Sequence, residues 1–515
     1  MEERKMEGSH RGPGAADQSP RARRLKSSGR KRTENNVKRN KAKSKKKRNG
    51  ADKNCSDREI VPLNAWARLQ LGQGGDPCGS GGSGAQAVHV VRTDTLRLLT
   101  TPELEDFLRH MGNATAKLIN MENFRRRKLL FETGKIDCSW KSAWERRYTE
   151  YFEIYKLLGS MNFAEACRLI GEQWRSFIGL LKAAKEGRLE PWQKVRPPGY
   201  RKDKDGQRIP IVVVRFDNYR VDMERRVLHL GYWNVDIPFT GKPRWLTKPD
   251  AKLERLIIAY DPVKKRWYAR VSVEVTLERK LNHGLKAGID LGRERLIAFV
   301  TEPLSESGEG VALLYRGGPL KSYYFYFEKK IAGIDRMLAD PKLEEADRAV
   351  LKEMRRRLYE KRKRHRDQLF ANSAAHLARM CLEFGVSIVF IGGLRGLAQD
   401  KPGKGNSNMW SYRKLKLRLA TTLENHGIAA FEIPEDNTSK VCARHGCEVV
   451  RKPRGLVWCS FGHVMHSDIN AAMNILARGR GKVPARVKVR SFIPTASKVI
   501  AVNEKKNSNP APRAG

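Results

Sequence analysis

Two short-spaced groups of Cys and His residues near the C-terminus restrict the local fold more than any other part of this sequence. The first group is Cys442-x2-His445-x-Cys447, and Cys459-x3-His463 follows after eleven further residues. Tetrahedral Zn²⁺ takes four nitrogen or sulfur ligands, and two such groups on hairpin turns supply them. The spacing therefore predicts a zinc ribbon with one Zn²⁺ held by four of these five side chains. A degenerate ribbon held by packing alone, without metal, is the alternative.

The remaining cysteines and the N-terminus indicate the compartment. The chain has eight cysteines, and three of them cluster beside histidines, which favours metal ligation in a reducing compartment over a disulfide framework. The N-terminus, MEERK, is charged from the start and lacks the apolar region of a signal peptide. No apolar run approaches the ~18–20 residues that span a bilayer. We therefore expect an intracellular protein without a membrane-spanning segment.

The charge of the chain predicts a polyanionic partner. Lys and Arg number 102 against 57 acids, a net charge of +45, and such an excess is typically used to neutralise phosphates. Residues 1–50 hold 18 Lys and Arg and 5 acids, with stretches such as KAKSKKKR that are typical of nuclear-localisation signals. This segment has too few apolar residues to fold alone. We predict a disordered basic tail over residues 1–60, a nuclear protein and a nucleic-acid partner.

The 515 residues are long enough for several domains, and their patterns change along the chain. Residues 100–207 have helical periodicity after the helix-start signal Thr101-Pro102. Residues 208–285 read as short antiparallel strands separated by turns, as in a small barrel. From residue 286, strands alternate with long basic helices, as in an α/β nuclease-type fold. The predicted class is a multidomain α+β protein.

Three carboxylates are candidates for a catalytic metal site. Asp290 is the lone charge in the apolar strand GIDLG, where it is costly unless it is paired or holds a metal. Glu435 follows a strand in FEIPEDNTSKVC, and a solvated acidic turn is the alternative there. Asp468 opens the helix HSDINAAMNILARG, and a plain N-cap is its alternative. Three acids from separate elements can hold two Mg²⁺ or Mn²⁺ ions about 3.5–4 Å apart, but the spacing leaves their convergence open.

The motifs GIDLG, TSKVC-x2-HG and WCSFGHVMHSDINAAMNILA together resemble the RuvC-type nuclease half of TnpB proteins and their relatives. Those relatives include the type V CRISPR effectors and the eukaryotic Fanzor proteins. The resemblance covers residues 286–480 specifically, and the earlier segments match only in layout. It implies an RNA-guided DNA endonuclease whose motifs carry Asp, Glu and Asp.

One departure from this family pattern decides the choice of the middle acid. The family's middle motif usually places a Glu after a buried strand, and in SIVFIGGL that slot is Gly392. Fanzor proteins and some TnpB relatives use a substitute Glu three residues before the TS of TSK-x-C, which here is Glu435. Glu432 and Asp436 are weaker candidates. Together with the basic tail, the substitution favours a Fanzor-like protein over a bacterial relative.

The resemblance also bears on the zinc ligands, because the family pattern has two cysteine pairs. His445 takes the second position of the first pair. Phe461 stands at the corresponding place in the second pair, so His463 is the expected substitute, with His466 behind it.

The resemblance implies an omega-type guide RNA, double-stranded target DNA, two Mg²⁺, one Zn²⁺ and a monomer encoded by or derived from a transposon. A nuclease-dead RNA-guided binder, motivated by Gly392, is one alternative, and a basic DNA-binding protein that uses no RNA is another. Four aromatic residues are candidates for base stacking, with core packing as their alternative: Trp140, Trp144, Tyr148 and Trp174. The expected domains are a basic tail (1–60), a first wedge segment with a Gly-rich loop (61–99), a helical recognition domain (100–207), a wedge β-barrel (208–285), a RuvC-like RNase H fold (286–437 and 465–490), an inserted zinc ribbon (438–464) and a C-terminal tail (491–515).

Overall fold

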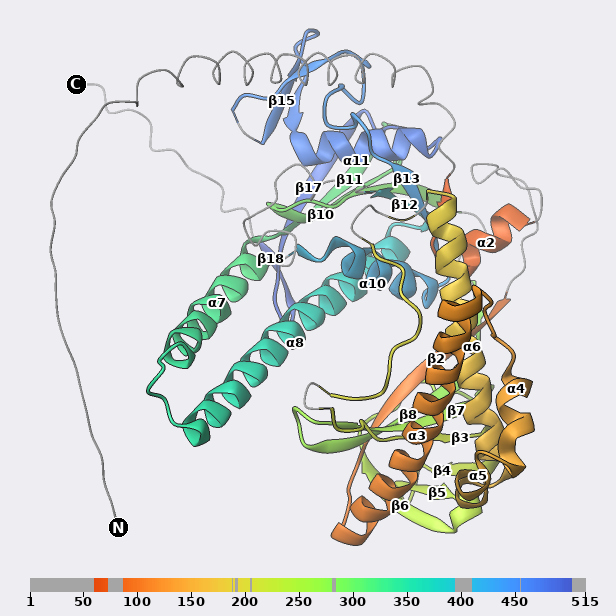
Figure 1. The fold of residues 1–515 in the computed structure, drawn as a ribbon. Coiled ribbons are helices and arrows are strands. Elements are labelled where there is room, and N and C mark those ends of the chain that lie inside the picture. Colours follow the sequence, from red (N-terminus) through yellow and green to blue (C-terminus); the bar gives the residue numbers. More distant parts are fainter. Residues whose placement is uncertain are drawn as a thin grey trace, which may run out of the picture. The chain divides into compact units, whose positions relative to one another are not determined.

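The described part of the chain forms three sheets and the helices that pack on them, within one compact unit, Ile60–Gly515 (Figure 1). This mixture confirms the predicted α+β class, while the recognition, wedge and RuvC-like names for its parts remain predictions. Residues 1–59 of the expected tail (1–60) and most of the Gly-rich loop (72–84) lie outside the described residues. The computed structural model describes residues 60–72, 87–187, 189, 193–203, 206–279, 284–393, 410–453 and 455–502.

A seven-stranded antiparallel sheet is built within the described residues from the strands expected over 208–285 and from one earlier strand. Along β8 every second residue from Trp267 to Leu277 is buried, as expected when one face of a strand covers a core. Its edge strands β3 and β4 are not hydrogen-bonded to each other in the described chain, so strand pairing does not close the sheet into the predicted barrel. In spatial order the strands are β3 (Ile211–Val214), β7 (Lys252–Asp261), β8 (Arg266–Glu278), β2 (Ala87–Leu98), β6 (Val235–Thr240), β5 (Val227–Leu230) and β4 (Tyr219–Asp222).

A group of helices between residues 102 and 185 packs against β3 of this sheet. Its first helix starts where Thr101-Pro102 predicts, since the Thr101 hydroxyl accepts a hydrogen bond from the backbone N–H of Leu104 at 3.3 Å. Gly134, with a φ of 71°, ends the same helix in the left-handed conformation that glycine tolerates. The helices are α3 (Pro102–Thr133), α4 (Trp140–Glu145), α5 (Phe152–Leu158) and α6 (Ser160–Lys185).

The C-terminal half is organised around a mixed sheet, which has eight strands in the described chain. β9, β10 and β11 form an antiparallel meander, and β12 and β13 then add parallel to β9. The parallel strands are continuous apolar runs because helices cover both of their faces. In spatial order the strands are β1 (Val61–Pro62), β13 (Ala429–Pro434), β12 (Val386–Gly393), β9 (Leu285–Asp290), β10 (Arg295–Thr301), β11 (Glu309–Arg316), β17 (Arg486–Pro494) and β18 (Val499–Val502).

Helices on the two faces of this sheet bury separate apolar cores. Alternate strand residues such as Ile289 and Phe299 pack against α8 and α10, whereas Ala298 and Val300 pack against α11. α7 and α8, two of the long basic helices expected after residue 286, form a hairpin (Figure 1). The helices are α7 (Gly318–Leu338), α8 (Glu345–Glu383), α10 (Tyr412–Glu424) and α11 (Ser467–Arg478).

Both ends of the described chain join this sheet, which the sequence did not predict. β1 pairs with β13, and α2 (Ala65–Gly72) packs on β13 as well as on β2, although the sequence groups residues 61–99 as one wedge segment. At the other end, β17 and β18 extend the sheet across the expected start of the tail at residue 491. The first half of β17 alternates basic residues with valine, and only Phe492 and Pro494 of the strand are buried, so its apolar signal is weak.

A small three-stranded antiparallel sheet lies between β13 and α11 in the described sequence, where the zinc ribbon is expected. None of the helices in the described ranges has the length and apolarity needed to cross a bilayer. The small sheet consists of β14 (Val449–Val450), β15 (Leu456–Cys459) and β16 (Val464–His466).

Candidate active site and metal centre

Asp290 is the last residue of β9 and lies on the face of the sheet that α11 covers. Gly288, two residues earlier on the same face, has no room for a side chain, because a Cβ there would lie 2.2 Å from the carbonyl oxygen of Ala472 in α11. The helix therefore approaches this strand closely. Burial raises the pKa of the Asp290 carboxyl to about 7, and the negative charge of Asp468 adds to the shift.

Asp468 lies in the first turn of α11 but does not cap it. The N-cap is His466, whose Nδ1 accepts a hydrogen bond from the backbone N–H of Asp468 at 3.2 Å. The Asp468 carboxylate accepts a bond from the Ser467 hydroxyl at 3.1 Å. The simple capping role that the sequence left open is therefore wrong, and the half-buried carboxylate stays available to interact with Asp290.

The Glu435 carboxylate occupies the space in which a side chain at position 392 would lie. A Cβ built on Gly392 would be 2.6 Å from Glu435 Oε2 and 2.8 Å from Ile475 Cδ1 of α11. Gly392 belongs to β12, which pairs in parallel register with β9 so that Ile391 is opposite Ile289. Position 392 is therefore one strand spacing, ~4.8 Å, from Asp290 on the same face of the sheet.

The surroundings of Glu435 make its charge costly. Burial raises the pKa of its carboxyl to about 8, and the charges of Asp290 and Asp436 add to the shift. Its Oε2 is buried and has no hydrogen-bond partner in the described part of the chain. The solvated acidic turn considered for this stretch is therefore wrong for Glu435.

The neighbouring acids have other partners. Glu432 Oε1 accepts a hydrogen bond from Lys416 Nζ at 2.6 Å, and the same oxygen lies against Gly393. Asp436 contributes its backbone carbonyl to a contact with Arg478. Glu432 is thus neutralised by an ion pair, whereas Glu435 has no ion-pair partner within the described ranges.

A ladder of side chains on α11 holds the loop that carries Glu435. Arg478 donates to the carbonyl oxygens of Pro434 and Asp436, the residues on either side of Glu435. One turn earlier, Asn474 Nδ2 donates to the Thr438 carbonyl at 2.7 Å. Another turn earlier, Asn470 accepts from the backbone N–H of Ala443 at 2.9 Å and donates to the carbonyl of Val441 at 2.8 Å. The i, i+4, i+8 spacing puts all three on one stripe of the helix that also carries Asp468.

Tyr412, at the start of α10, also faces this site. Burial raises the pKa of its hydroxyl, and the charges of Asp290 and Glu435 raise it further. Neither Tyr412 nor the α11 ladder was predicted from the sequence. The spacing of Asn470, Asn474 and Arg478 is a signal for one helix face, but the sequence does not show that this face contacts a loop.

The donor set fits a hard divalent cation. The charges of the three acids are coupled in a chain, Asp468 with Asp290 and Asp290 with Glu435. An ion such as Mg²⁺ or Mn²⁺, which prefers oxygen ligands, would compensate both buried charges and give Glu435 Oε2 a partner. The structure thus brings the three predicted acids to one end of the sheet.

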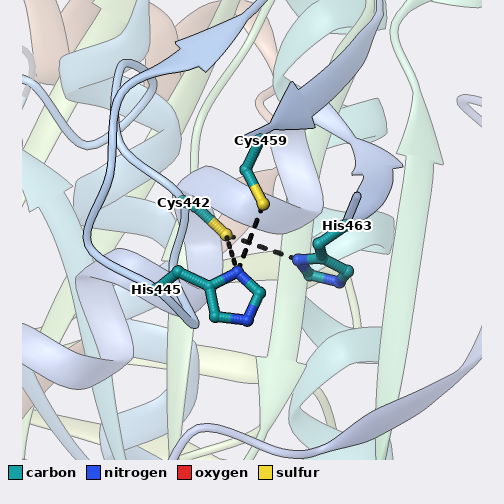
Figure 2. Close-up of side chains that lie close together, drawn as sticks. All are labelled: Cys442, His445, Cys459 and His463. Atoms are coloured by element: carbon teal, nitrogen blue, oxygen red, sulfur yellow. Dashed lines mark hydrogen bonds between the residues drawn. The ribbon is translucent and has the colours of Figure 1, made fainter. Parts of the chain in front are cut away.

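Four Cys and His side chains converge in the small three-stranded sheet (Figure 2). Cys442 Sγ lies 3.7 Å from His445 Nδ1 and 3.4 Å from His463 Nδ1, and His445 Nδ1 lies 3.2 Å from Cys459 Sγ. Bond lengths of 2.3 Å to sulfur and 2.0–2.1 Å to nitrogen imply about 3.5 Å between such atoms around tetrahedral zinc. All four ligand atoms lie within 4.8 Å of one another, so the set fits one Zn²⁺.

The turns that carry these ligands explain which of the five predicted residues converge. Gly446 and Gly462, with φ values of 66° and 74°, allow the tight turns within the two groups. Cys447 is not part of the cluster, and its backbone carbonyl accepts a hydrogen bond from the N–H of Cys442 at 2.8 Å. His466 caps α11 and is not among the four either.

The aromatic residues considered for base stacking are mostly part of the core. Trp174 is fully buried and donates its indole N–H to Asn123 Oδ1 at 2.9 Å. Trp140 and Trp144 are partly buried and pack against the core of the helical region. Only Tyr148 of the four is largely exposed, at 60%.

Comparison with known proteins shows the family. Residues 268–398 match the family described as a probable transposase (OrfB_IS605), and residues 412–475 match the Cas12f1-like TNB domain. The TnpB-like protein ORF457 of Acidianus two-tailed virus is 37% identical over 422 residues, which are 77% of this chain and 88% of the viral protein. The chain belongs to the TnpB-like proteins. The two matched segments include Asp290, Glu435, Asp468 and the Cys/His cluster of this TnpB-like protein.

Solved structures similar to this TnpB-like chain are more distant. A Cas12f1–sgRNA–target DNA complex has 17% identity and a TM-score of 0.28, covering 75% of this chain and 98% of the other. The mini-RNA-guided endonuclease CRISPR-Cas_phi3 has 11% identity and a TM-score of 0.39, covering 76% and 92%.

Proposed function

We propose that this protein is an RNA-guided DNA endonuclease with a RuvC-like site formed by Asp290, Glu435 and Asp468. The observation that carries the proposal is the Glu435 carboxylate beside Gly392, in the space where the family's middle motif has its own Glu. Membership of the TnpB-like proteins and a net charge of +45 support nucleic acid as the partner.

The residues of the site have distinct roles in this proposal. When bound, two Mg²⁺ ions supply an activated water and stabilise the leaving oxygen of a phosphodiester. Asp290 presents a buried carboxylate from the end of β9, Glu435 presents one from the residue after β13, and Asp468 presents its own from α11. Arg478 fixes the backbone on both sides of Glu435, so that its side chain stays directed at the space beside Gly392.

The Cys/His cluster is proposed to hold one structural Zn²⁺ through Cys442, His445, Cys459 and His463. The distances between their ligand atoms support this assignment. Because Asn470 of α11 bonds the backbone of Ala443 beside Cys442, a filled zinc site would also stabilise the helix that carries Asp468.

The proposed partners are an omega-type guide RNA and double-stranded target DNA, bound by a monomer encoded by or derived from a transposable element. Guide pairing would determine the target sequence, while the protein would contact a short duplex motif and the shape of the heteroduplex. We assign recognition to residues 100–207, the wedge to residues 208–285 and target binding to the ribbon at 438–464.

We further propose that the protein is of the Fanzor type and acts in the nucleus. Glu435 as the substitute acid and the basic residues 1–50 support this. Deleting residues 1–50 should abolish nuclear accumulation of a fluorescent fusion in eukaryotic cells and leave guided cleavage in vitro largely intact. A truncated protein that folds but no longer cleaves would assign the segment to the nucleic-acid channel instead.

The competing function is a nuclease-dead RNA-guided DNA-binding protein, and Gly392 is the observation that favours it. One experiment separates the two. The RNA that copurifies with the full chain is sequenced, and a DNA target complementary to its guide portion is incubated with the complex in Mg²⁺ or in EDTA. We expect cleavage in Mg²⁺, and none in EDTA or with Asp290→Asn. Binding without cleavage would support the nuclease-dead alternative, and the absence of any RNA would refute both.

A further inference from the structure

A cavity of 380 Å³ lies between α7, the middle of α8, the start of α10 and Val263 of the β7–β8 turn, and none of the three acids or the Cys/His ligands lines it. It is at the small end of the ~300–1,000 Å³ range of pockets that bind small ligands, so it has room for a single group of nucleotide size and none for a duplex. The lining residues that matter here are Tyr323, Tyr359, Arg362, His365, Arg366 and Lys414.

Two partly exposed tyrosine rings line this cavity. Tyr323 and Tyr359 are each 37% exposed although they lie on packed helices. The Tyr323 ring lies 5.0 Å from the His365 ring at an interplanar angle of 32°, and the Arg362 guanidinium lies 4.8 Å from the centre of the Tyr359 ring. Flat surfaces of this kind are those on which unpaired bases stack, with Arg adding cation–π attraction.

The charge of the cavity is unbalanced. Its lining has five Lys and Arg residues against one acid, Glu360. Four of the five cations form ion pairs, Arg356 with Glu353, Arg362 with Glu328, Lys363 with Glu360 and Arg366 with Asp367, but Lys414 forms none within the described ranges. The charge of Lys414 is therefore left without a paired acid in the described chain, and it favours an anion such as a phosphate group.

His365 adds an unused polar atom to the same wall. Its Nδ1 is buried and has no hydrogen-bond partner among the residues described. Burial lowers the pKa of the imidazole, and the charges of Lys361 and Arg364 lower it further. A neutral imidazole both donates and accepts hydrogen bonds, which suits the edge of a base or a sugar hydroxyl better than a phosphate alone.

We propose that this cavity binds one unpaired nucleotide of a nucleic-acid strand, with the base on the tyrosine rings and the phosphate at Arg366 and Lys414. The inference deepens the proposed function, because the guide RNA and a separated DNA strand both present this chemistry. It assigns a nucleotide-binding role to the part of the α7–α8 hairpin beside α10, which belongs neither to the catalytic site nor to the zinc site.

The test compares two double variants with the same loss of charge. Arg366→Ala with Lys414→Ala removes two cations from the cavity. Lys352→Ala with Arg357→Ala removes two cations from α8 outside the lining, where the side chains are 58% and 61% exposed. General attraction to phosphates should fall similarly in both, so a difference between them reports the cavity. Full-length protein freed of copurified RNA is titrated with fluorescent eight-nucleotide single-stranded RNA and DNA.

We expect the cavity variant to bind its preferred strand at least about tenfold more weakly than the matched control. Tyr359→Leu, which keeps all charges, should lose about 5- to 150-fold, the usual worth of one stacked base. Crosslinking with 4-thiouridine RNA or 4-thiothymidine DNA, mapped to peptides, should mark α7 or α8 and identify which strand enters.

Equal affinities of the cavity variant and the control, together with full affinity of Tyr359→Leu, would overturn the inference. The assay needs neither a guide nor cleavage, so its outcome is separate from that of the proposed function. A protein without guided cleavage whose cavity variants still lose affinity would refute the nuclease and leave the nucleotide site in place.

Discussion

Exchanging the acid between positions 392 and 435 should reveal whether Glu435 replaces the family's middle carboxylate. In Gly392→Glu alone, the new side chain enters space already filled by Glu435, since its Cβ would lie 2.6 Å from Glu435 Oε2. Overpacking of this kind costs ~1–3 kcal/mol. With an unfolding entropy of about 2.1 cal/mol/K per residue, this cost lowers the unfolding midpoint of the unit Ile60–Gly515 by about 1–3 °C. Shortening residue 435 removes this contact.

The partner variant has to be chosen by volume. Glu435→Gln keeps the clashing atoms, so Gly392→Glu with Glu435→Gln should stay inactive. In Gly392→Glu with Glu435→Ala, the contact of Ile475 Cδ1 at 2.8 Å remains, and that atom is the movable end of a side chain. This double variant should regain most of the ~1–3 kcal/mol of stability that Gly392→Glu loses, and it should cleave a guided target faster than Gly392→Glu.

Four proteins are compared: the unchanged protein, Gly392→Glu, Glu435→Ala and the double variant that combines the two. Each is measured by differential scanning fluorimetry without metal and by single-turnover cleavage of a guided target. The reasoning would be contradicted if the two substitutions changed the unfolding midpoint by amounts that simply add in the double variant. If Gly392→Glu lowered the midpoint equally with Glu or Ala at position 435, the Glu435 carboxylate would not fill the space beside Gly392, and its role as the substitute would be refuted.

Three further predictions concern the surroundings of the site. Arg478→Ala should slow cleavage at limiting Mn²⁺ by about tenfold or more and raise the Mn²⁺ concentration needed for half-maximal rate, because Arg478 holds the backbone on both sides of Glu435. Guided DNA binding should stay unchanged, and an unchanged Mn²⁺ requirement would show that Arg478 does not position Glu435. Protein analysed by mass spectrometry should hold about one zinc per chain, and Cys459→Ala should lose this zinc while Cys447→Ala keeps it, because of these two cysteines only Cys459 lies in the four-ligand cluster. Equal loss of zinc from both variants would refute the ligand set. The metal-free protein should lose thermal stability as pH rises from about 5 to 8.5, because Asp290 and Glu435, with pKa values of about 7 and 8, hold protons in the folded state that the unfolded chain has released. Mg²⁺ should offset this loss, and thermal stability that rises over this pH range would contradict the burial of these acids.

The sequence predicts the chemistry of the site better than its geometry. The motif around TSK-x-C singles out Glu435 because the substitution follows a family pattern. The occupation of the space beside Gly392 depends on the parallel register of β12 with β9 and on the approach of α11, and no local pattern encodes either. The same limit applies to Cys447, whose spacing resembles that of a ligand until the turn at Gly446 directs His445 to the cluster.

Pairing between strands that are far apart in the sequence is the second reason why the structure differs from the sequence-based predictions. β1 pairs with β13, so that Val61 lies opposite Glu432, a partner far away in sequence. Asn64 then bonds the carbonyl of Ile428, and Arg92 forms an ion pair with Glu424 of α10. These contacts tie the start of the described chain to the candidate nuclease sheet. Local apolar patterns locate most helices and strands but leave such partners undetermined.

The most direct test of the account compares Glu435→Gln with Glu432→Gln in single-turnover cleavage of a guided DNA target in Mg²⁺. Both variants remove one charge from the same strand end, but Glu432 is already paired with Lys416, whereas Glu435 has no cation partner among the described residues. A two-metal site contributes several kcal/mol to transition-state stabilisation, so losing a ligand worth ~4 kcal/mol slows cleavage about 10³-fold. The account predicts that loss for Glu435→Gln with target binding intact, and less than about tenfold for Glu432→Gln. Full cleavage by Glu435→Gln, or an equal loss in both variants, would contradict it.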